Sequence, residues 1–276
     1  MEENKRVYPR GQLSGKWLNY LLLFLSAVLL LSGFFWRGTG EDVQLSLVDT
    51  PTPIPLDAAF DETIESREIT LPGEIWYALQ LGAFDKEELA VKLAQSYQTR
   101  GAAGYVWQDT RFRALAALYP SKDEVQSVRT QLSTKHYIET YAYEIRLPPL
   151  KLRIRGMRGQ LDIMEAGFLH GGDLVDQLQE VSVLMDRQEL GVAEAMEKLK
   201  NIRSQMDIVS QRLSERFSPP RHQAVQGLLD CFAGYRAFCE ELGEEINSVL
   251  LATQVKFQAI AALDALRKIY DGLASS

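Results

Sequence analysis

The sequence is poor in the residues that build disulfide frameworks and metal centres. Its 276 residues include two cysteines and three histidines, too few for a disulfide scaffold or for a zinc site rich in Cys or His. Ten prolines and nineteen glycines are also too few for a collagen-like or wholly disordered chain. Basic residues number 30 against 37 acidic ones, a formal net charge of −7. Because nucleic-acid phosphates require a basic surface, we expect no nucleic-acid partner.

One long stretch of the chain carries no charge at all. Residues 17–36 are almost entirely apolar, and as a helix they span about 30 Å, the thickness of the hydrocarbon core of a bilayer. Trp17, Tyr20 and Trp36 stand near the ends of the run, where aromatic belts lie in membrane proteins. The alternatives are a cleaved signal peptide, whose apolar region is shorter, and a buried core helix. The run predicts a transmembrane helix at 17–36.

The charges on either side of this run predict its orientation. Lys5, Arg6, Arg10 and Lys16 precede it, whereas Arg37 is the base that follows closely. The positive-inside rule then makes residues 1–16 a cytoplasmic basic tail. We therefore expect a single-pass protein of the cytoplasmic membrane, with the N-terminus in the cytoplasm and the bulk of the chain outside.

Residues 37–71 have the composition of a linker. Between Glu41 and Thr70 there are eight acidic residues and one base, Arg67, and three prolines alternate with other residues from 51 to 55. This composition favours an extended or disordered spacer.

Residues 72–148 alternate between strand and helix periods. Strand patterns at 75–84, 103–108, 112–118 and 137–147 are separated by two helical patterns, the second of which begins at Ser121 with Glu124 in the N3 position. The order is βαββαβ. It predicts an α+β domain with an antiparallel sheet, two helices on one face and the other face open.

The motifs of this segment resemble those of the SPOR (sporulation-related repeat) domain. They are the stretch Gln80-Leu81-Gly82-Ala83-Phe84 followed by a helix, and the later stretches 101–106, 112–115 and 119–125. The pattern departs from the family at Ala117, where Gly is usual, and at Tyr119, where Phe is usual.

The resemblance implies binding of bacterial peptidoglycan, at glycan strands that have lost their stem peptides, on the helix-free face of the sheet. Gln80 and Arg113 match the usual binding positions of the family. Strand alternation adds flat aromatic rings to this face. The candidate glycan-binding residues are therefore Gln80, Arg113, Trp107, Trp76, Tyr105 and Tyr141.

Three of these residues also have an ordinary structural interpretation. Gln80 fits a solvent-facing strand position, and Trp76 fits a packing residue under the linker. Arg113 can pair with Glu139 or Glu144 as a surface ion pair of small energetic value.

After Pro148 and Pro149 the apolar period changes to that of a helix. We expect an all-α bundle of three or four helices at 151–273, with 219–272 as one helix or two. This region resembles no family that we recognise. The apolar stripes are Leu174, Leu178, Val181 and Met185; then Leu199, Ile202, Met206, Val209, Leu213 and Phe217; then Val225, Leu228, Phe232, Tyr235, Cys239, Leu242, Ile246, Val249 and Thr253.

Few residues in the bundle segment suggest a catalytic or binding role. The bases Lys151, Arg153, Arg155 and Arg158 contact anionic wall polymers or bridge the two domains. Cys231 and Cys239, eight residues apart on one helix, are too distant for a mutual disulfide and are expected to be core thiols. We expect no catalytic residues, no metal and no cofactor.

Together these features predict a membrane-anchored, non-catalytic peptidoglycan-binding protein of bacterial cell division, sporulation or wall remodelling. The bundle would bind a protein partner or self-associate. One alternative is a purely structural tether or oligomerisation protein with a degenerate SPOR fold, and Ala117 fits such drift. The other is a wall hydrolase with catalysis in the bundle.

Overall fold

The computed structural model describes residues 63–243 and 245–275. The predicted cytoplasmic tail at 1–16, the transmembrane helix at 17–36 and most of the linker at 37–71 lie outside these residues and stay predictions.

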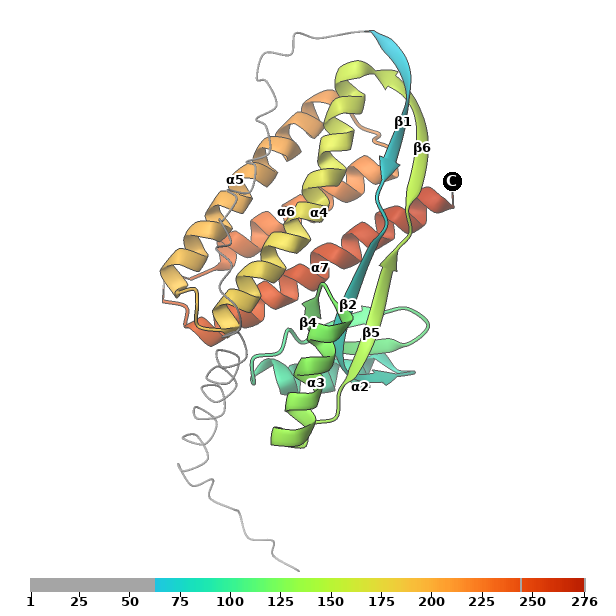
Figure 1. Ribbon diagram of the computed structural model, residues 1–276. Helices are drawn as coiled ribbons and strands as arrows, with labels where there is room; N and C mark the ends of the chain where they lie inside the picture. Colours follow the sequence, from blue (N-terminus) through green and yellow to red (C-terminus); the bar gives the residue numbers. More distant parts are fainter. Residues whose placement is uncertain (1–62, 244, 276) are drawn as a thin grey trace, which may run out of the picture. The chain divides into compact units, whose positions relative to one another are not determined.

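The described residues form two parts that differ in architecture, an α+β domain and a helical bundle (Figure 1). The α+β domain has the predicted order βαββαβ, and its antiparallel sheet has the strand order β3-β4-β2-β5. Its elements are β2 (Glu74–Phe84), α2 (Glu87–Gln98), β3 (Tyr105–Gln108), β4 (Phe112–Tyr119), α3 (Lys122–His136) and β5 (Tyr141–Leu147).

Both helices of this domain pack on the same face of the sheet, as the alternation predicts. Leu79, Ala116 and Val125 form the small core between that face and the helices. Ser121 caps α3 by accepting a hydrogen bond from the backbone N–H of Glu124 at 3.3 Å, which satisfies one donor of the first helical turn. The last strand is shorter than expected, because Tyr137 ends α3 in a left-handed conformation.

Two further strands lie beyond the four-stranded sheet, and because of them the expected domain limits are wrong. β1 (Ile64–Leu71) and β6 (Leu150–Met157) pair with each other in antiparallel register from Ile64 opposite Met157 to Leu71 opposite Leu150. Figure 1 shows this ribbon extending from β2 and β5 along the bundle. The linker therefore ends before residue 64, and the bundle segment begins with a strand rather than a helix.

The two long strands bend where Gly73 meets Pro149. A Cβ atom on Gly73 would lie 2.8 Å from Cδ and 2.9 Å from the backbone nitrogen of Pro149, which is too close for any side chain. Above the bend, Leu152, Ile154 and Ile69 face the helices, whereas Lys151, Arg153 and Arg155 are exposed. Three of the bases expected to form a cluster thus share the outer face of the ribbon.

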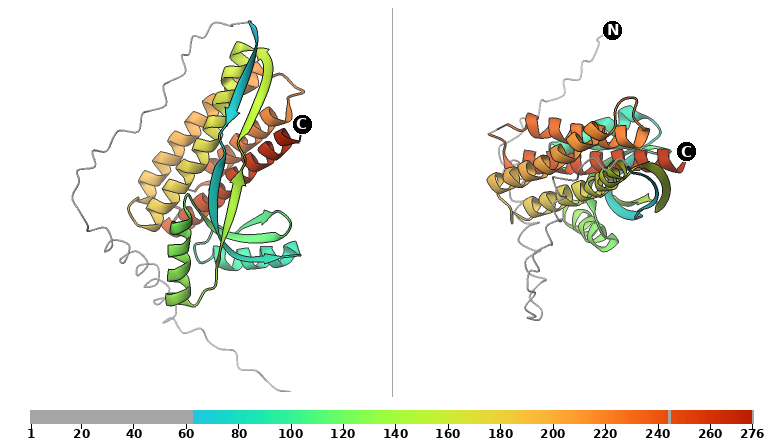
Figure 2. Two further views of the ribbon diagram at one scale, coloured as in Figure 1. Left: turned by 45° about the vertical axis from the view of Figure 1, so that its right-hand side comes forward. Right: turned by 90° about the horizontal axis from the view of Figure 1, so that it is seen from above.

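The remaining described residues form a four-helix bundle, which agrees with the expected all-α region. Each helix packs against the next one along the chain, and α4 also packs against α7, so that the four helices run side by side (Figure 2). They are α4 (Arg158–Asp186), α5 (Val192–Arg216), α6 (Gln223–Glu241) and α7 (Ser248–Ala274).

The predicted apolar stripes form the core of the bundle. The first stripe is fully buried, and so is the second except for Phe217, which is half-buried. The third stripe does not belong to one helix, because the chain leaves helical geometry between Glu241 and Ser248. Segment 219–272 is therefore two helices, and Val249 is exposed.

Helix α7 is a long, apolar and largely buried helix of the bundle. Among the described helices it alone is long and apolar enough to cross a membrane by length and composition, and 61% of its most apolar window is buried inside the protein. A buried core helix of a folded domain has the same properties.

The expectation of an open sheet face is wrong for this chain. α7 packs against β3 and β4 on the side away from α2 and α3, and one continuous hydrophobic core joins that face to the bundle. The reason is visible in β4, where five consecutive residues from Ala114 to Leu118 are buried. A strand that is buried on both sides belongs to a sheet that is covered on both faces.

Candidate functional site

The covered face of the sheet holds most of the aromatic candidates. Trp76 is 5% exposed and Trp107 is 1% exposed. The ring of Tyr105 meets that of Phe257 in α7 edge-on, with 5.1 Å between the ring centroids. These three candidate side chains therefore contact the protein itself, and no sugar ring reaches them while α7 stays in place.

A buried carboxylate anchors α7 to the sheet. Asp264 accepts a hydrogen bond from the Tyr105 hydroxyl at 2.9 Å, and it pairs with Arg267 at 2.8 Å and with Lys268 at 2.9 Å. Burial opposes ionisation of Asp264, but the hydrogen bonds from Lys268, Arg267 and Tyr105 outweigh it and hold the pKa below its usual value. Burial and the Asp264 charge raise the pKa of Tyr105, so the phenol stays a proton donor.

A second polar cluster lies at the end of the sheet, beyond this contact. Arg113 donates through Nη1 to Oε1 of Gln80 at 2.8 Å and through Nε to Oδ2 of Asp109 at 2.9 Å. The Tyr143 hydroxyl donates to the same Asp109 oxygen at 2.7 Å. We call these four residues, Gln80, Arg113, Asp109 and Tyr143, the edge cluster.

The charges of the edge cluster are held in place by its hydrogen bonds. Partial burial raises the pKa of Asp109, but hydrogen bonds from the Arg111 backbone, Tyr143 and Arg113 outweigh this effect and lower it overall. The side chain of Arg113 is 18% exposed, so its guanidinium is fixed but still reaches solvent. Such a positioned donor can bind hydroxyl or carboxylate oxygens of a ligand.

Stacked rings and guanidinium groups connect the edge cluster to α7. Arg113 lies over the ring of Tyr143 at 4.3 Å, Tyr143 meets Trp107 edge-on, and Arg267 lies over Trp107 at 4.9 Å. Arg267 comes from the bundle, and it places a second cation beside the predicted binding face.

The structure thus divides the six predicted site residues. Gln80, which is 8% exposed, and Arg113 are in direct contact on the two inner strands, β2 and β4. Tyr141, 52% exposed, stands opposite Gln80 in the strand pairing. Trp107 touches the cluster from beneath α7, whereas Trp76 and Tyr105 lie under the bundle. Their role in glycan binding stays a prediction.

Sequence reasoning missed Asp109, Tyr143 and Arg267 as parts of this arrangement. Tyr143 shares a strand face with Tyr141, so alternation could have found it. Asp109 in the β3–β4 turn and Arg267 on α7 carry no local pattern that marks them, because the contacts depend on tertiary packing.

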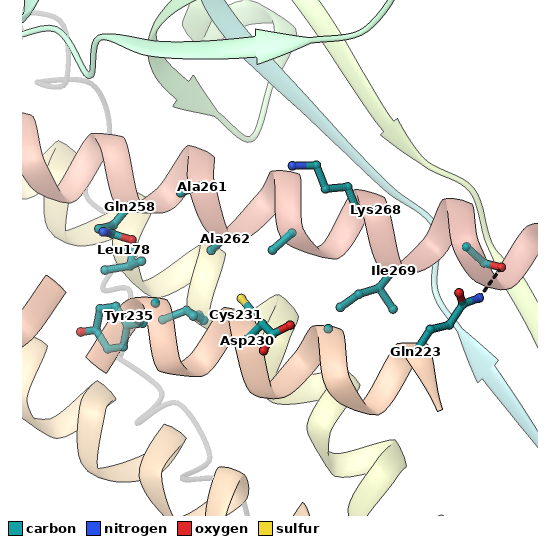
Figure 3. Close-up of a pocket in the computed structure, with 15 residues that line it drawn as sticks. Leu178, Gln223, Asp230, Cys231, Tyr235, Gln258, Ala261, Ala262, Lys268 and Ile269 are labelled. Atoms are coloured by element: carbon teal, nitrogen blue, oxygen red, sulfur yellow. Dashed lines mark hydrogen bonds between the residues drawn. The ribbon is translucent and has the colours of Figure 1, made fainter. Parts of the chain in front are cut away.

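A groove in the bundle lies between α6 and α7 (Figure 3). It has a volume of about 400 Å³, and Cys231 and Asp230 of α6 face Ala262 and Ile269 of α7 across it. Burial raises the pKa of the Cys231 thiol to about 12, so this sulfur stays protonated and unreactive at neutral pH. The description of Cys231 as a core thiol fits this geometry.

The described residues contain no group of three or more His, Cys, Asp or Glu side chains placed to hold a metal ion.

Comparison with known families agrees with the motifs and with the fold. Residues 76–143 match the family model of the SPOR domain, so the chain contains a SPOR domain, and the predicted resemblance is confirmed. A SPOR domain implies non-catalytic binding of peptidoglycan, usually in cell division. Searches of curated proteins and of solved structures found no match.

Proposed function

We propose that this chain is a membrane-anchored, non-catalytic protein that binds glycan strands of bacterial peptidoglycan outside the cytoplasm, at sites of division or wall remodelling. The observation that carries the proposal is the SPOR domain at 76–143. The uncharged run at 17–36 supports the anchor, and the bundle supplies a surface for a protein partner or a second copy.

The geometry favours the edge of the sheet as the glycan contact. Burying an aromatic side chain of about 150–250 Å² stabilises a contact by about 4–6 kcal/mol. Separating the bundle from Trp107, Trp76 and Tyr105 would therefore cost as much as the net stability of a typical domain. Arg113, whose side chain is 18% exposed, and Tyr141, 52% exposed, need no such separation. Gln80 is 8% exposed and would act by holding Arg113 in place.

The covered face also favours a second candidate function. If the sheet serves only to pack against α7, the protein is a structural tether whose SPOR fold has lost glycan binding. The burial of Trp107 at 1% exposure is the observation that supports this alternative.

A sacculus pull-down with the full chain in detergent separates the two functions. We expect the parent to sediment with purified sacculi. Gln80→Ala combined with Arg113→Ala should weaken binding about tenfold or more, because the charged guanidinium donor and the amide that accepts from it are lost. Gln211→Ala combined with Arg212→Ala on α5 is the matched control and should bind like the parent. A parent that stays in the supernatant indicates the tether.

Two further measurements address the remaining parts of the proposal. A fluorescent fusion of the full chain should concentrate at septa, whereas a uniform envelope signal would contradict a role in division. A lytic band in zymography on purified wall would overturn the non-catalytic assignment and favour the hydrolase.

A further inference from the structure

A polar groove lies along the outer strand of the SPOR sheet, away from the α7 contact. It has a volume of about 400 Å³ and runs between α3 and the segment that leads into β5. The two elements lie beside each other in Figures 1 and 2. The wall from α3 consists of Gln126, Arg129, Thr130 and Ser133.

Arg129 holds the two walls of the groove together. It donates through Nε to the carbonyl oxygen of Thr140 at 2.9 Å and through Nη1 to Oε1 of Gln126 at 2.7 Å. Because a guanidinium only donates, the oxygen of the Gln126 amide faces Arg129, and the amide NH₂ group is left as a donor.

The opposite wall consists of Glu139, Thr140 and Tyr141. Tyr141 is 52% exposed and stands at the border of the groove, where its side chain shares a strand face with Tyr143. Thr140 is 5% exposed, and its hydroxyl oxygen has no hydrogen-bond partner among the residues that the structure describes. An unpaired buried hydroxyl is unfavourable, and a small shift would bring it to a ligand in the groove.

These groups define the chemistry of a ligand. Arg129 and Glu139 cancel in formal charge, and the other lining groups are hydroxyls, an amide and a phenol ring. A phosphate or a metal ion requires an excess of charge of one sign. Hydroxyls and amides instead suit the edge of a neutral pyranose, which carries hydroxyls, and the exposed Tyr141 ring at the border suits its apolar face.

The groove adjoins the edge cluster. Tyr141 pairs with Gln80 across the β2–β5 ladder, and neighbouring strands lie about 5 Å apart. The edge cluster lies on the α7 side of the sheet and the groove lies beside α3, with Tyr141 at the start of the outer strand between them. One polymer can therefore pass from Arg113 around Tyr141 into the groove. We infer that the α3–β5 groove is a second subsite for a neutral sugar unit of the same glycan strand, which rests on the proposed glycan binding of the SPOR domain.

A pair of neighbouring substitutions on α3 tests this inference. Ser133 lines the groove, whereas Thr134, the next residue, does not, and both side chains are exposed. The probe is denuded glycan strands, released from purified sacculi by amidase and titrated into the full chain in detergent. We expect Ser133→Trp to fill the groove and weaken binding about tenfold, and Thr134→Trp to leave it unchanged.

A second pair tests the ring of Tyr141 between the edge cluster and the groove. Tyr141→Ala should weaken binding about five- to tenfold through loss of the stacking ring. Tyr137→Ala, which removes a ring that is 90% exposed outside the groove, should not. Thr140→Val should weaken binding while raising the melting temperature, because it removes an unpaired buried hydroxyl.

The outcomes separate this inference from the proposed function. If the parent binds the strands and Ser133→Trp binds as well as Thr134→Trp, the groove is not a sugar subsite, although glycan binding stands. If Ser133→Trp and Thr134→Trp both lose binding, the assignment of a neutral sugar to the groove is overturned. The same conclusion follows if soluble polyphosphate displaces the glycan from the parent but not from Ser133→Trp. A parent that binds no glycan refutes the proposed function itself.

Discussion

At the scale of single residues, Asp264 is a buried carboxylate that links α7 to the sheet. Its side chain is 7% exposed, and three donors from α7 and β3 converge on it. Removing one member of a buried charged cluster leaves the other members desolvated and without a partner. The resulting loss of folding free energy is larger than the net stabilisation that the intact cluster provides.

Asp264→Asn should therefore lower the free energy of unfolding by about 2–3 kcal/mol, measured by urea denaturation. Asp271→Asn is the matched control, since this carboxylate also pairs with Arg267 but is 59% exposed, and it should cost less than about 1 kcal/mol. Equal effects of the two substitutions would show that the buried cluster contributes no more than a surface pair.

The lowered pKa of Asp264 also predicts a direction of pH dependence. An aspartate with a folded pKa below its unfolded value of about 3.9 stabilises the fold above that value and loses the contribution as the pH falls further. Stability should decline below about pH 4, and Asp264→Asn should flatten this decline. A parent and a variant with parallel acid profiles would contradict the assignment.

At the scale of elements, the bend between the sheet and the β1–β6 ribbon depends on one small residue. Pro149 passes so close to Gly73 that a Cβ atom there would lie 2.8 Å from its ring. The strands of both pairs turn together at this point, which lets the ribbon lie on the bundle while the sheet lies against α7.

Gly73→Ala should lower the free energy of unfolding by about 1–3 kcal/mol, because the backbone must shift to relieve the overlap. Gly234→Ala in α6 provides the contrast, since its Cβ would meet nothing within 4 Å and alanine favours the helix by about 0.5–1 kcal/mol. Thermal denaturation of both variants should give shifts of opposite sign.

The elements that were predicted correctly are those with a clear local period. Strand alternation and the Ser121 cap are sufficient to predict βαββαβ, and the apolar stripes are sufficient to predict a bundle. The strand at 150–157 was missed although Leu150, Leu152 and Ile154 alternate with Lys151, Arg153 and Arg155, since the bases were interpreted as a charged cluster. That α7 covers the second face of the sheet depends on packing between distant segments. In the sequence, only the apolar run Ala114–Leu118 indicated a strand buried on both faces.

At the scale of the whole molecule, the SPOR sheet and the bundle share one core. Proteins that share a core unfold as one cooperative unit, whereas domains joined by a linker unfold separately. Amide hydrogen exchange in denaturant should show β4 and α7 losing protection together.

Phe257→Ala on α7 extends this prediction to a variant. Because Phe257 packs on Tyr105 in β3, its truncation should lower stability by about 3 kcal/mol and speed exchange in both layers. Faster exchange confined to α7 would indicate two independent domains.

The pairing of β1 with β6 has a consequence for how the protein is made. Leu71 leaves the ribosome early, but its partner Leu150 follows roughly 80 residues later, which at synthesis rates of about 5–20 residues per second is about 4–16 s. During that interval β1 has an unpaired edge of the kind that attracts other strands. Completion of the ribbon is thus a late event, and a nascent chain released before residue 157 would present that edge to its neighbours.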